Sequence, residues 1–360
     1  MQSPGRGSVN KITGERIRAA MSPSNNDNNG AVTLEKLAKL AKVSISTVSR
    51  ALNDHPSISP STKKRLWALA RKHGYEFRRY MPASPIGAEG AITVVTPRVR
   101  GRPLPLSHPF FLELLASIGE AARDRGCDFT VSHLTPANYE DLVHATTTGR
   151  ANGVIFLGQG ALHDQFNRLA ETDSRFVVWG AQIPGQKYCT VGTDNMLGGK
   201  RATQHLIKLG RKRILFLGGS DPEATQRYRG YTEALQEAGI KLDDALIGRV
   251  EFEAESAESL VDTMLNRKVP FDGIVAASDL IALGGIRALH RARVDVPRDV
   301  SVVGYDNNLL SRLSTPTLST VQQDIPKAGR MLVSKLLEWT GDVRPEMLGT
   351  ELIVRESCGA

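Results

Sequence analysis

The chain has 360 residues, of which 41% are hydrophobic and 23% charged, a composition typical of a soluble globular protein of two or three domains. No apolar run approaches the roughly 18 residues of a membrane span, and the polar N-terminus has no signal-peptide core. The three cysteines form no CxxC pattern, which argues against a disulfide framework or a cysteine-rich zinc site and predicts a reduced, cytoplasmic protein without a metal or cofactor.

Positive charge is concentrated at one end of the chain. The net charge is +8, but residues 1–81 carry +10 and the remainder carries −2. A small basic unit on a near-neutral body is the pattern expected of a nucleic-acid-binding domain joined to another domain. A merely solvated basic face would give the same charge, so the predicted secondary-structure elements are needed to distinguish the two interpretations.

Residues 1–30 are polar and Asn-rich, which predicts disorder, and Met21 is an alternative start. From residue 31 on, apolar residues recur at helical spacing after Thr33, which is a candidate N-cap. A second short helix is expected after Ser44, another candidate N-cap. Pro60 opens a third helix that ends near Gly74. Three short helices with a tight turn between the first two predict an all-α helix-turn-helix domain over residues 31–78.

Residues 79–90 contain Pro82 and Pro85 and are expected to form a linker. Beyond it, apolar strand patterns alternate with helices, which predicts an α/β doubly wound body over residues 91–360. The expected strands are 91–96, 128–132, 153–157, 175–179, 213–217, 273–277 and 300–305. The expected helices are 111–125, 199–209, 228–238 and 280–292.

The stretch from Val32 to Asn53 resembles the head of the LacI/GalR family of bacterial transcription regulators, whose pattern is T-[LI]-x-[DE]-[LV]-A-x-x-A-G-V-S-x-x-T-V-S-R-x-L-N. The resemblance implies that the second helix enters the major groove of double-stranded operator DNA, with some side chains at base edges and others at phosphates. Arg50 suits guanine because a guanidinium bonds bidentately to O6 and N7, although it would also neutralise phosphate. The residues expected to bind DNA are Thr33, Ser44, Ile45, Ser46, Thr47, Ser49, Arg50 and Asn53, whereas Val43, Val48 and Leu52 are expected to pack the core.

Two positions depart from the family pattern. Lys42 replaces the usual turn glycine, so a left-handed backbone there would cost about 1 kcal/mol. The family follows its head with a hinge helix whose leucine enters the minor groove. Here Pro82 and Pro85 would break such a helix and Ser84 stands where the leucine is expected, with Met81 or Ile86 as substitutes.

The resemblance extends over the body through short motifs at residues 108–111, 191–199, 227–231, 278–284, 302–307 and 319–323. It implies a periplasmic-binding-protein-like (type I) body of two doubly wound subdomains, residues 91–191 with 324–340 and residues 192–323 with 341–358. Small molecules bind beyond the carboxyl ends of parallel strands in such sheets.

The expected effector-binding residues are polar groups for sugar hydroxyls and aromatic rings for the apolar sugar faces. Simpler roles compete. Asp194 and Asn195 would equally cap helices, and Asp279 is expected to cap a helix rather than to contact a ligand. Trp179 would equally belong to the core, and Phe111 is expected to lie there. The expected residues are Phe110, Trp179, Asp194, Arg227, Phe252, Ser278, Asp306 and Gln323.

The resemblance therefore implies a homodimeric transcriptional repressor that binds operator DNA and responds to a mono- or disaccharide, which in this family is more often an inducer than a corepressor. A corepressor-type regulator that responds to a nucleobase or another metabolite is the alternative, and a solute-binding protein is a weaker one. The chain contains no GxSxG, HExxH or P-loop motif, which argues against an enzyme.

Overall fold

The computed structural model describes residues 33–52, 57–73, 91–96, 98–99, 102–103, 107–147, 151–172, 175–341 and 343–359. The chain forms two compact units, residues 1–79 and 80–360. The predictions for residues 1–30, for Asn53 and for the linker 79–90 lie outside the described residues.

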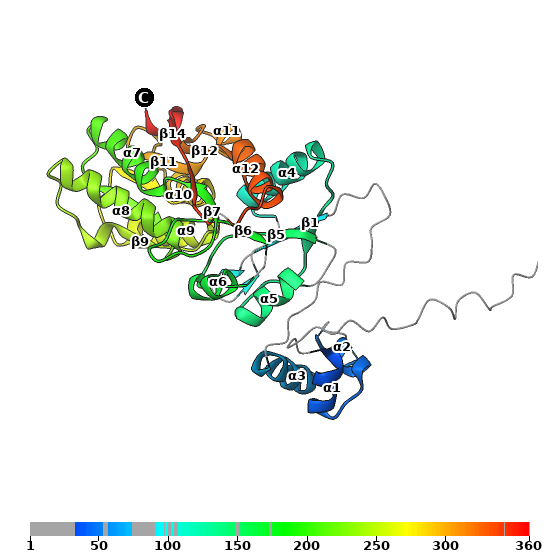
Figure 1. Ribbon diagram of the computed structural model, residues 1–360. Coiled ribbons are helices and arrows are strands. Elements are labelled where there is room, and N and C mark those ends of the chain that lie inside the picture. Colours follow the sequence, from blue (N-terminus) through cyan, green and yellow to red (C-terminus); the bar gives the residue numbers. More distant parts are fainter. Residues whose placement is uncertain are drawn as a thin grey trace, which may run out of the picture. The chain divides into compact units, whose positions relative to one another are not determined.

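The first unit contains the three predicted helices (Figure 1). They are α1 (Leu34–Ala41), α2 (Ile45–Leu52) and α3 (Pro60–Lys72). Their apolar faces meet in a small core that includes Leu37, Val48, Leu52 and Leu66, with Val43 packed against it. The predicted packing roles of Val43, Val48 and Leu52 are therefore confirmed.

The helix ends in this unit follow the sequence signals. Thr33 caps α1, since its Oγ1 accepts a hydrogen bond from the Lys36 N–H at 3.3 Å. Ser44 Oγ accepts one from the Thr47 N–H at 3.1 Å at the start of α2. Between them, Lys42 has φ 54° and ψ 45°, so the lysine adopts the left-handed backbone that carries this cost.

The second unit is built on two six-stranded sheets, each flanked by helices (Figure 1). In the first sheet all pairs are parallel, and Thr93 lies level with Thr130 on one side and Val154 on the other. The order in this sheet is β13 (Glu346–Leu348), β7 (Thr190–Thr193), β6 (Phe176–Trp179), β5 (Ala151–Leu157), β1 (Ala91–Val95) and β4 (Phe129–Ser132). Its helices are α4 (Pro109–Asp124), α5 (Tyr139–Thr147), α6 (His163–Leu169) and α12 (Ile325–Leu337). A two-stranded antiparallel pair, β2 (Arg98–Val99) with β3 (Arg102–Pro103), follows β1.

The second sheet is parallel except for its last pair, in which β14 runs antiparallel to β12. The order is β14 (Thr350–Ile353), β12 (Ser319–Gln323), β11 (Ser301–Asp306), β10 (Gly273–Ala276), β8 (Ile214–Gly218) and β9 (Ile247–Arg249). Its helices are α7 (Asn195–Lys208), α8 (Pro222–Glu237), α9 (Ala254–Asn266), α10 (Asp279–Arg291) and α11 (Leu309–Leu313), with short 3-10 turns η1 (Asp244–Leu246) and η2 (Glu356–Cys358).

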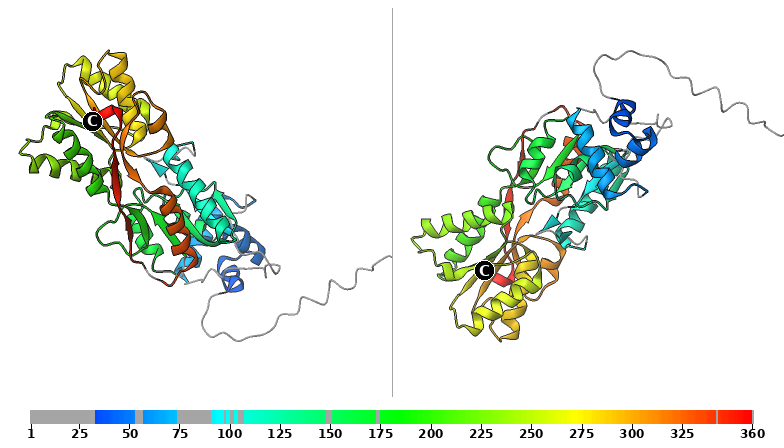
Figure 2. Two further views of the ribbon diagram at one scale, coloured as in Figure 1. Left: turned by 90° about the horizontal axis from the view of Figure 1, so that it is seen from above. Right: turned by 90° about the horizontal axis from the view of Figure 1, so that it is seen from below.

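The chain passes between the two subdomains three times. It leaves the first sheet after β7, returns after β12, and crosses again at Gly349 between β13 and β14. The consecutive strands β13 and β14, drawn in red, make the third crossing and run from one subdomain into the other (Figure 2). The predicted division placed 341–358 with the second subdomain, but Glu346–Leu348 pairs with Val191–Thr193 and so belongs to the first sheet.

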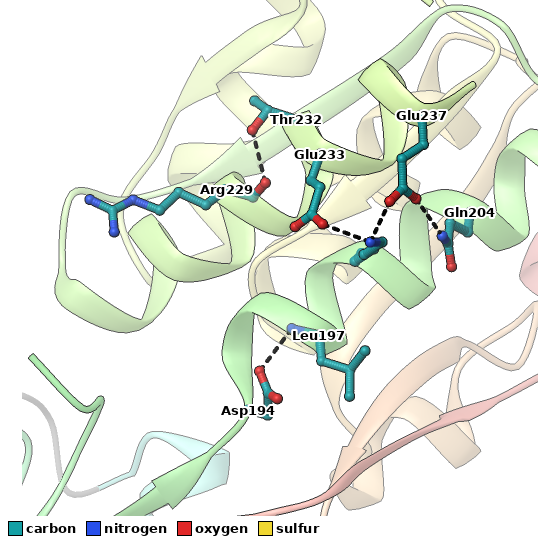
Figure 3. A network of polar contacts seen from close by, with 8 residues as sticks. Asp194, Leu197, Gln204, Arg229, Thr232, Glu233 and Glu237 are labelled. Carbon is teal, nitrogen blue, oxygen red and sulfur yellow. Dashed lines mark hydrogen bonds and ion pairs between the residues drawn. The ribbon is translucent and has the colours of Figure 1, made fainter. Parts of the chain in front are cut away.

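Helices α7 and α8 approach closely because glycines face each other's backbone. A Cβ on Gly230 would lie 1.9 Å from the Met196 carbonyl oxygen, and one on Gly199 would lie 2.2 Å from the Arg227 carbonyl oxygen. Further along the same pair, Lys200 Nζ bonds Glu233 and Glu237, each at 2.7 Å (Figure 3). This packing fixes the segment of α8 that carries Arg227.

Candidate functional sites

The exposed face of α2 carries most of the residues expected to bind DNA. Thr33, Ser44, Ser46 and Arg50 are exposed, and Ile45 is 47% exposed. Thr47 and Ser49 are half-buried. This face offers hydroxyl groups, one guanidinium and one apolar side chain, the groups that bind phosphate oxygens, guanine and the thymine methyl.

The hydroxyl groups at the start of α2 are linked to one another. Ser44 Oγ lies 2.8 Å from both Ser46 Oγ and Thr47 Oγ1, in addition to its capping bond. A hydroxyl cluster at a helix N-terminus presents donors where an anion is favoured. The first turn of α2 contains no acidic side chain.

In the body, a cavity of about 440 Å³ lies between the two subdomains. One wall follows the carboxyl ends of β1 and β5 in the first sheet, and the other follows β8 and β9 in the second. The described lining is largely apolar, with Phe156, Phe166 and Phe252 among its rings, and its polar side chains are Thr96, Gln159, Ser220, Asp221 and Glu251. An apolar cavity with a few polar groups at the switch point of parallel sheets is the usual form of a small-molecule site.

Among the residues expected to bind an effector, Phe252 is the member that lines this cavity. Gln159 and Asp221 were not anticipated. Each follows a predicted strand by two to four residues. Position directly after a strand end is therefore the sequence signal that could have identified them.

A buried polar network lies beside the crossings between the subdomains. Gln323 donates from Nε2 to Asp306 Oδ1 at 2.7 Å and accepts from Thr193 Oγ1 at 2.8 Å, which joins the two sheets. Arg227 donates from Nε to Asn195 Oδ1 at 2.8 Å, and its guanidinium lies 3.6 Å from the centre of the Tyr305 ring. The network therefore brings together Arg227, Asp306 and Gln323 of the expected set.

Burial controls the charge of the carboxyl groups in this region. It raises the pKa of Asp306 to about 7, although the charge of Arg227 and the hydrogen bond from Gln323 oppose the shift. Burial together with the charge of Asp306 also raises the pKa of Asp279. Asp279 accepts from Thr320 Oγ1 at 2.5 Å and from the Asn308 N–H at 2.9 Å.

Two of the expected polar residues cap helices. Asp194 accepts from the Leu197 N–H at 2.9 Å at the start of α7 (Figure 3), as its alternative role required. Ser278 is fully buried and caps α10 by accepting from the Ile281 N–H at 3.2 Å. The cap expected of Asp279 is therefore wrong, because Ser278 provides it.

The two remaining aromatic residues lie in the core of the first subdomain. Phe110 and Trp179 are each 5% exposed, and their ring centres are 5.7 Å apart. His108, at the start of α4, packs its ring edge-on against Phe252 of the other subdomain, with 6.4 Å between ring centres. Burial lowers the pKa of His108 to about 4, although the backbone of Phe252 partly opposes this shift.

Comparison with protein families gives two matches. Residues 33–76 match the bacterial regulatory proteins of the lacI family, and residues 203–358 match a periplasmic-binding-protein-like domain. In the described part of the chain no helix is long and apolar enough to cross a membrane, and no group of three or more His, Cys, Asp or Glu side chains is placed to hold a metal ion.

Full-length relatives are regulators. The HTH-type transcriptional regulator CelR of Thermobifida fusca is 30% identical over 345 residues, which cover 90% of this chain and 98% of CelR. The HTH-type transcriptional repressor CytR of Escherichia coli (strain K12) is 28% identical over 344 residues, 92% of this chain and 97% of CytR.

Solved structures of similar proteins are also transcription regulators. The transcriptional regulator CelR–cellobiose complex is 29% identical, with a TM-score of 0.66 over 91% of this chain and 99% of that one. The lac repressor dimer bound to operator and the anti-inducer ONPF, at 24% identity, shares the fold with a TM-score of 0.65 over 92% of this chain and 100% of that one. The fold class predicted from the sequence is confirmed, and the chain belongs to the lacI family of bacterial regulatory proteins.

Proposed function

We propose that this chain is a sequence-specific DNA-binding transcriptional repressor whose affinity for its operator is controlled by a small carbohydrate bound in the cavity of the body. The observation that carries the proposal is the presence in one chain of an exposed α2 face suited to DNA and an apolar cavity between two α/β subdomains. The full-length similarity to CelR, solved with cellobiose, supports a carbohydrate effector.

On the DNA side, Ile45, Ser46 and Arg50 contact base edges, whereas Thr33, Ser44, Thr47, Ser49 and Asn53 contact phosphates. A homodimer presents two such faces to a roughly palindromic operator, because half-site symmetry mirrors protein symmetry. The protein acts in the cytoplasm and binds its effector without chemical conversion. Its domains are the head 31–78, the linker 79–90 and the body 91–360.

On the effector side, the cavity takes its walls from both subdomains, so a bound sugar changes the free energy of one subdomain arrangement relative to another. Phe252 supplies a ring for an apolar sugar face. Arg227, Asp306 and Gln323 respond through the network that joins the two sheets. An effector that favours the arrangement with weaker operator affinity acts as an inducer.

The test is a fluorescence anisotropy titration of the full chain against the intergenic DNA upstream of its own gene, followed by a panel of mono- and disaccharides. Tight, salt-sensitive binding that one sugar reverses is the expected result. Binding that is strengthened by a nucleobase or another metabolite would instead establish a corepressor. No preference for this DNA over a scrambled duplex would contradict the proposed repressor.

A further inference from the structure

Some bonds between the two subdomains belong to the crossing segments, and others do not. Thr193 and Gln323, which bond at 2.8 Å, are the last residues of strands that lead into crossings, so their bond lies close to the axis about which the subdomains turn. Bonds between residues away from the crossings exist in one arrangement only, because opening the body separates their partners. In the described part of the chain these include two contacts that we call clasps, one on α4 and one on α8.

The first clasp joins α4 to the start of α11. Glu113, on α4, accepts through Oε1 from the Leu309 N–H at 2.8 Å. Leu309 is the first residue of α11, and the first N–H groups of a helix have no partner within that helix. The cap residue Asn308 accepts through Oδ1 from the Ser311 N–H at 3.3 Å. The Leu309 N–H therefore takes its acceptor from the other subdomain.

The second clasp joins the start of α8 to the loop after β6. Gln226 Nε2 donates to the Gln182 carbonyl oxygen at 2.8 Å, and Glu223 Oε1 accepts from the Ala181 N–H at 3.3 Å. The loop is also fixed to its own subdomain, because Gln159 Nε2 donates to the Ala181 carbonyl oxygen at 2.6 Å. Movement of the loop is therefore transmitted to the first sheet.

The two clasps act on opposite faces of the second sheet. Helix α11 packs beside α10, and α8 packs beside α7. The chain runs in one direction across the sheet from β8 to β9 and in the other direction from β10 to β11. Because such crossovers are right-handed, α8 and α10 cover opposite faces. Moving the two subdomains apart therefore breaks both clasps together.

We propose that Glu113 and Gln226 are positioning residues that hold the body in the arrangement described here and thereby set the operator affinity of the full chain. Each acts without contacting effector or DNA, by favouring one subdomain arrangement over the others. A hydrogen bond of this kind shifts such an equilibrium about two- to tenfold. A ligand shifts the same equilibrium only by its difference in affinity for the arrangements, so the clasps set how large that difference must be. The proposal rests on the proposed effector-controlled repressor and assigns part of its regulation.

Hydrogen–deuterium exchange of the full chain, without DNA or sugar, tests the proposal. Mass spectrometry of peptides that isolate the Leu309 and Ala181 amides gives the readout. The informative amide in each variant is the one in the other clasp, because its own bond is left intact. We expect Glu113→Ala to raise exchange at Ala181, and Gln226→Ala to raise exchange at Leu309, about two- to tenfold, since a shared opening exposes both amides.

The matched controls remove bonds that lie within one subdomain. Glu338→Ala loses the bond from Arg125 Nη2 at 2.8 Å, between α12 and α4. Gln204→Ala loses the bond from its Nε2 to Glu237 Oε2 at 3.1 Å, between α7 and α8. In both variants the two clasp amides should exchange as in the wild type.

Glu113→Gln separates the hydrogen bond from the charge. Its amide oxygen still accepts from the Leu309 N–H, so exchange at both clasp amides should match the wild type. Thermal unfolding of every variant serves as a check, because a general loss of stability would raise exchange throughout the body rather than at the clasps.

Operator affinity, measured by anisotropy, should change at least twofold and in the same direction in Glu113→Ala and Gln226→Ala, and should be unchanged in the controls. The proposal is overturned if the amide of the other clasp is unaffected in both variants, if the controls change as much, or if both clasp variants bind operator as the wild type does. A chain that binds operator and responds to a sugar, but whose clasps are not coupled, would retain the repressor function and lose this proposal.

Discussion

Arg50 is the residue of α2 whose chemistry distinguishes base reading from simple charge neutralisation. It is exposed on the helix, and a bidentate contact with guanine contributes about 1–3 kcal/mol of discrimination. We expect Arg50→Ala to weaken operator binding about 5- to 150-fold and to leave binding to a scrambled duplex much less affected. Anisotropy on the two duplexes measures both, and an equal loss on both would assign Arg50 to phosphate.

The effector response provides the control for this variant. Arg50 belongs to the first compact unit and the cavity to the second, so calorimetry should give unchanged sugar affinity. Loss of both operator and sugar binding would indicate a misfolded protein rather than lost base contacts.

Lys42 has a left-handed backbone that glycine adopts at lower cost. With φ 54°, it ends α1 and leads into α2. We expect Lys42→Gly to raise the free energy of unfolding of the head by about 1 kcal/mol. Lys39→Gly, the same change within α1, should lower it by about as much. Chemical denaturation followed through Trp67, which packs against the head core, measures both. A stabilising Lys39→Gly or a destabilising Lys42→Gly would show that backbone strain does not govern this turn.

Three buried carboxyl groups with raised pKa values, Glu223, Asp306 and Asp279, make the stability of the body depend on pH. Burial raises the pKa of Glu223 and of Asp306 to about 7, whereas both groups titrate near pH 4 in an unfolded chain. Between these values the folded state holds protons that the unfolded state has lost. The free energy of unfolding therefore falls as the pH rises through this window.

His108 acts in the opposite sense. Burial lowers its pKa to about 4, so its contribution is present above about pH 6.5, the unfolded value, and is lost as the pH falls through the folded value. The interval from pH 6.5 to 8 therefore reports the carboxyl groups. Urea denaturation should show a loss of roughly 1 kcal/mol per carboxyl across it. Glu223→Gln and Asp306→Asn should each flatten the slope, and an unchanged slope in both would contradict these pKa shifts.

At the scale of elements, the contact between α7 and α8 depends on a glycine. A Cβ on Gly230 would lie 1.9 Å from the Met196 carbonyl oxygen and 2.6 Å from the Lys200 backbone nitrogen. We expect Gly230→Ala to lower the free energy of unfolding by about 3 kcal/mol, because backbone atoms cannot yield as a flexible side chain does. Thermal denaturation measures this loss.

Gly285→Ala is the matched control, since the nearest atoms to its Cβ would lie 3.6 Å away, an ordinary contact. Its effect should be near zero or slightly stabilising, because alanine favours a helix more than glycine does. Equal effects at the two positions would show that the close approach of α7 and α8 is not rigid.

Elements with a strong apolar pattern could be predicted from the sequence, whereas most of those defined by polar or edge positions could not. The seven expected strands all occur: six are largely apolar runs in the interior of a sheet, and the seventh, Phe129–Ser132, is an edge strand. The strand Ser319–Gln323 was missed because four of its five residues are polar. Helix α8 begins at Pro222 rather than Tyr228, because its first turns carry capping and polar residues instead of an apolar stripe.

The candidate site was predicted less completely than the fold. Phe252 lines the cavity, but Gln159 and Asp221 lie in loops, whose curvature no periodicity specifies. Phe110 and Trp179 illustrate the converse, since an aromatic residue near a strand end suits the core as well as a ligand. Periodicity identifies which residues are buried, whereas a binding site depends on which loops meet.

At the scale of the whole molecule, the uneven charge separates the two binding activities. Residues 1–81 carry +10 and the rest of the chain −2. A protein that displaces counterions from about 6–10 phosphates loses 10³- to 10⁵-fold in affinity between 50 and 200 mM salt. We expect the operator complex to weaken at least about a thousandfold over this range, with the affinity for an uncharged sugar constant. Anisotropy and calorimetry at the two salt concentrations measure these, and a parallel loss of sugar affinity would contradict the separation.

The three chain passages between the subdomains are tied to one another. The Asp194 N–H donates to the Leu348 carbonyl oxygen at 3.1 Å, and Thr193 Oγ1 bonds Gln323 Oε1 at 2.8 Å. Three crossing segments that are hydrogen-bonded side by side resist sliding and twisting of the two subdomains far more than they resist bending about the crossings. The body therefore has one soft degree of freedom, an opening angle. A ligand that fills the cavity between the two subdomains would therefore act along this single coordinate.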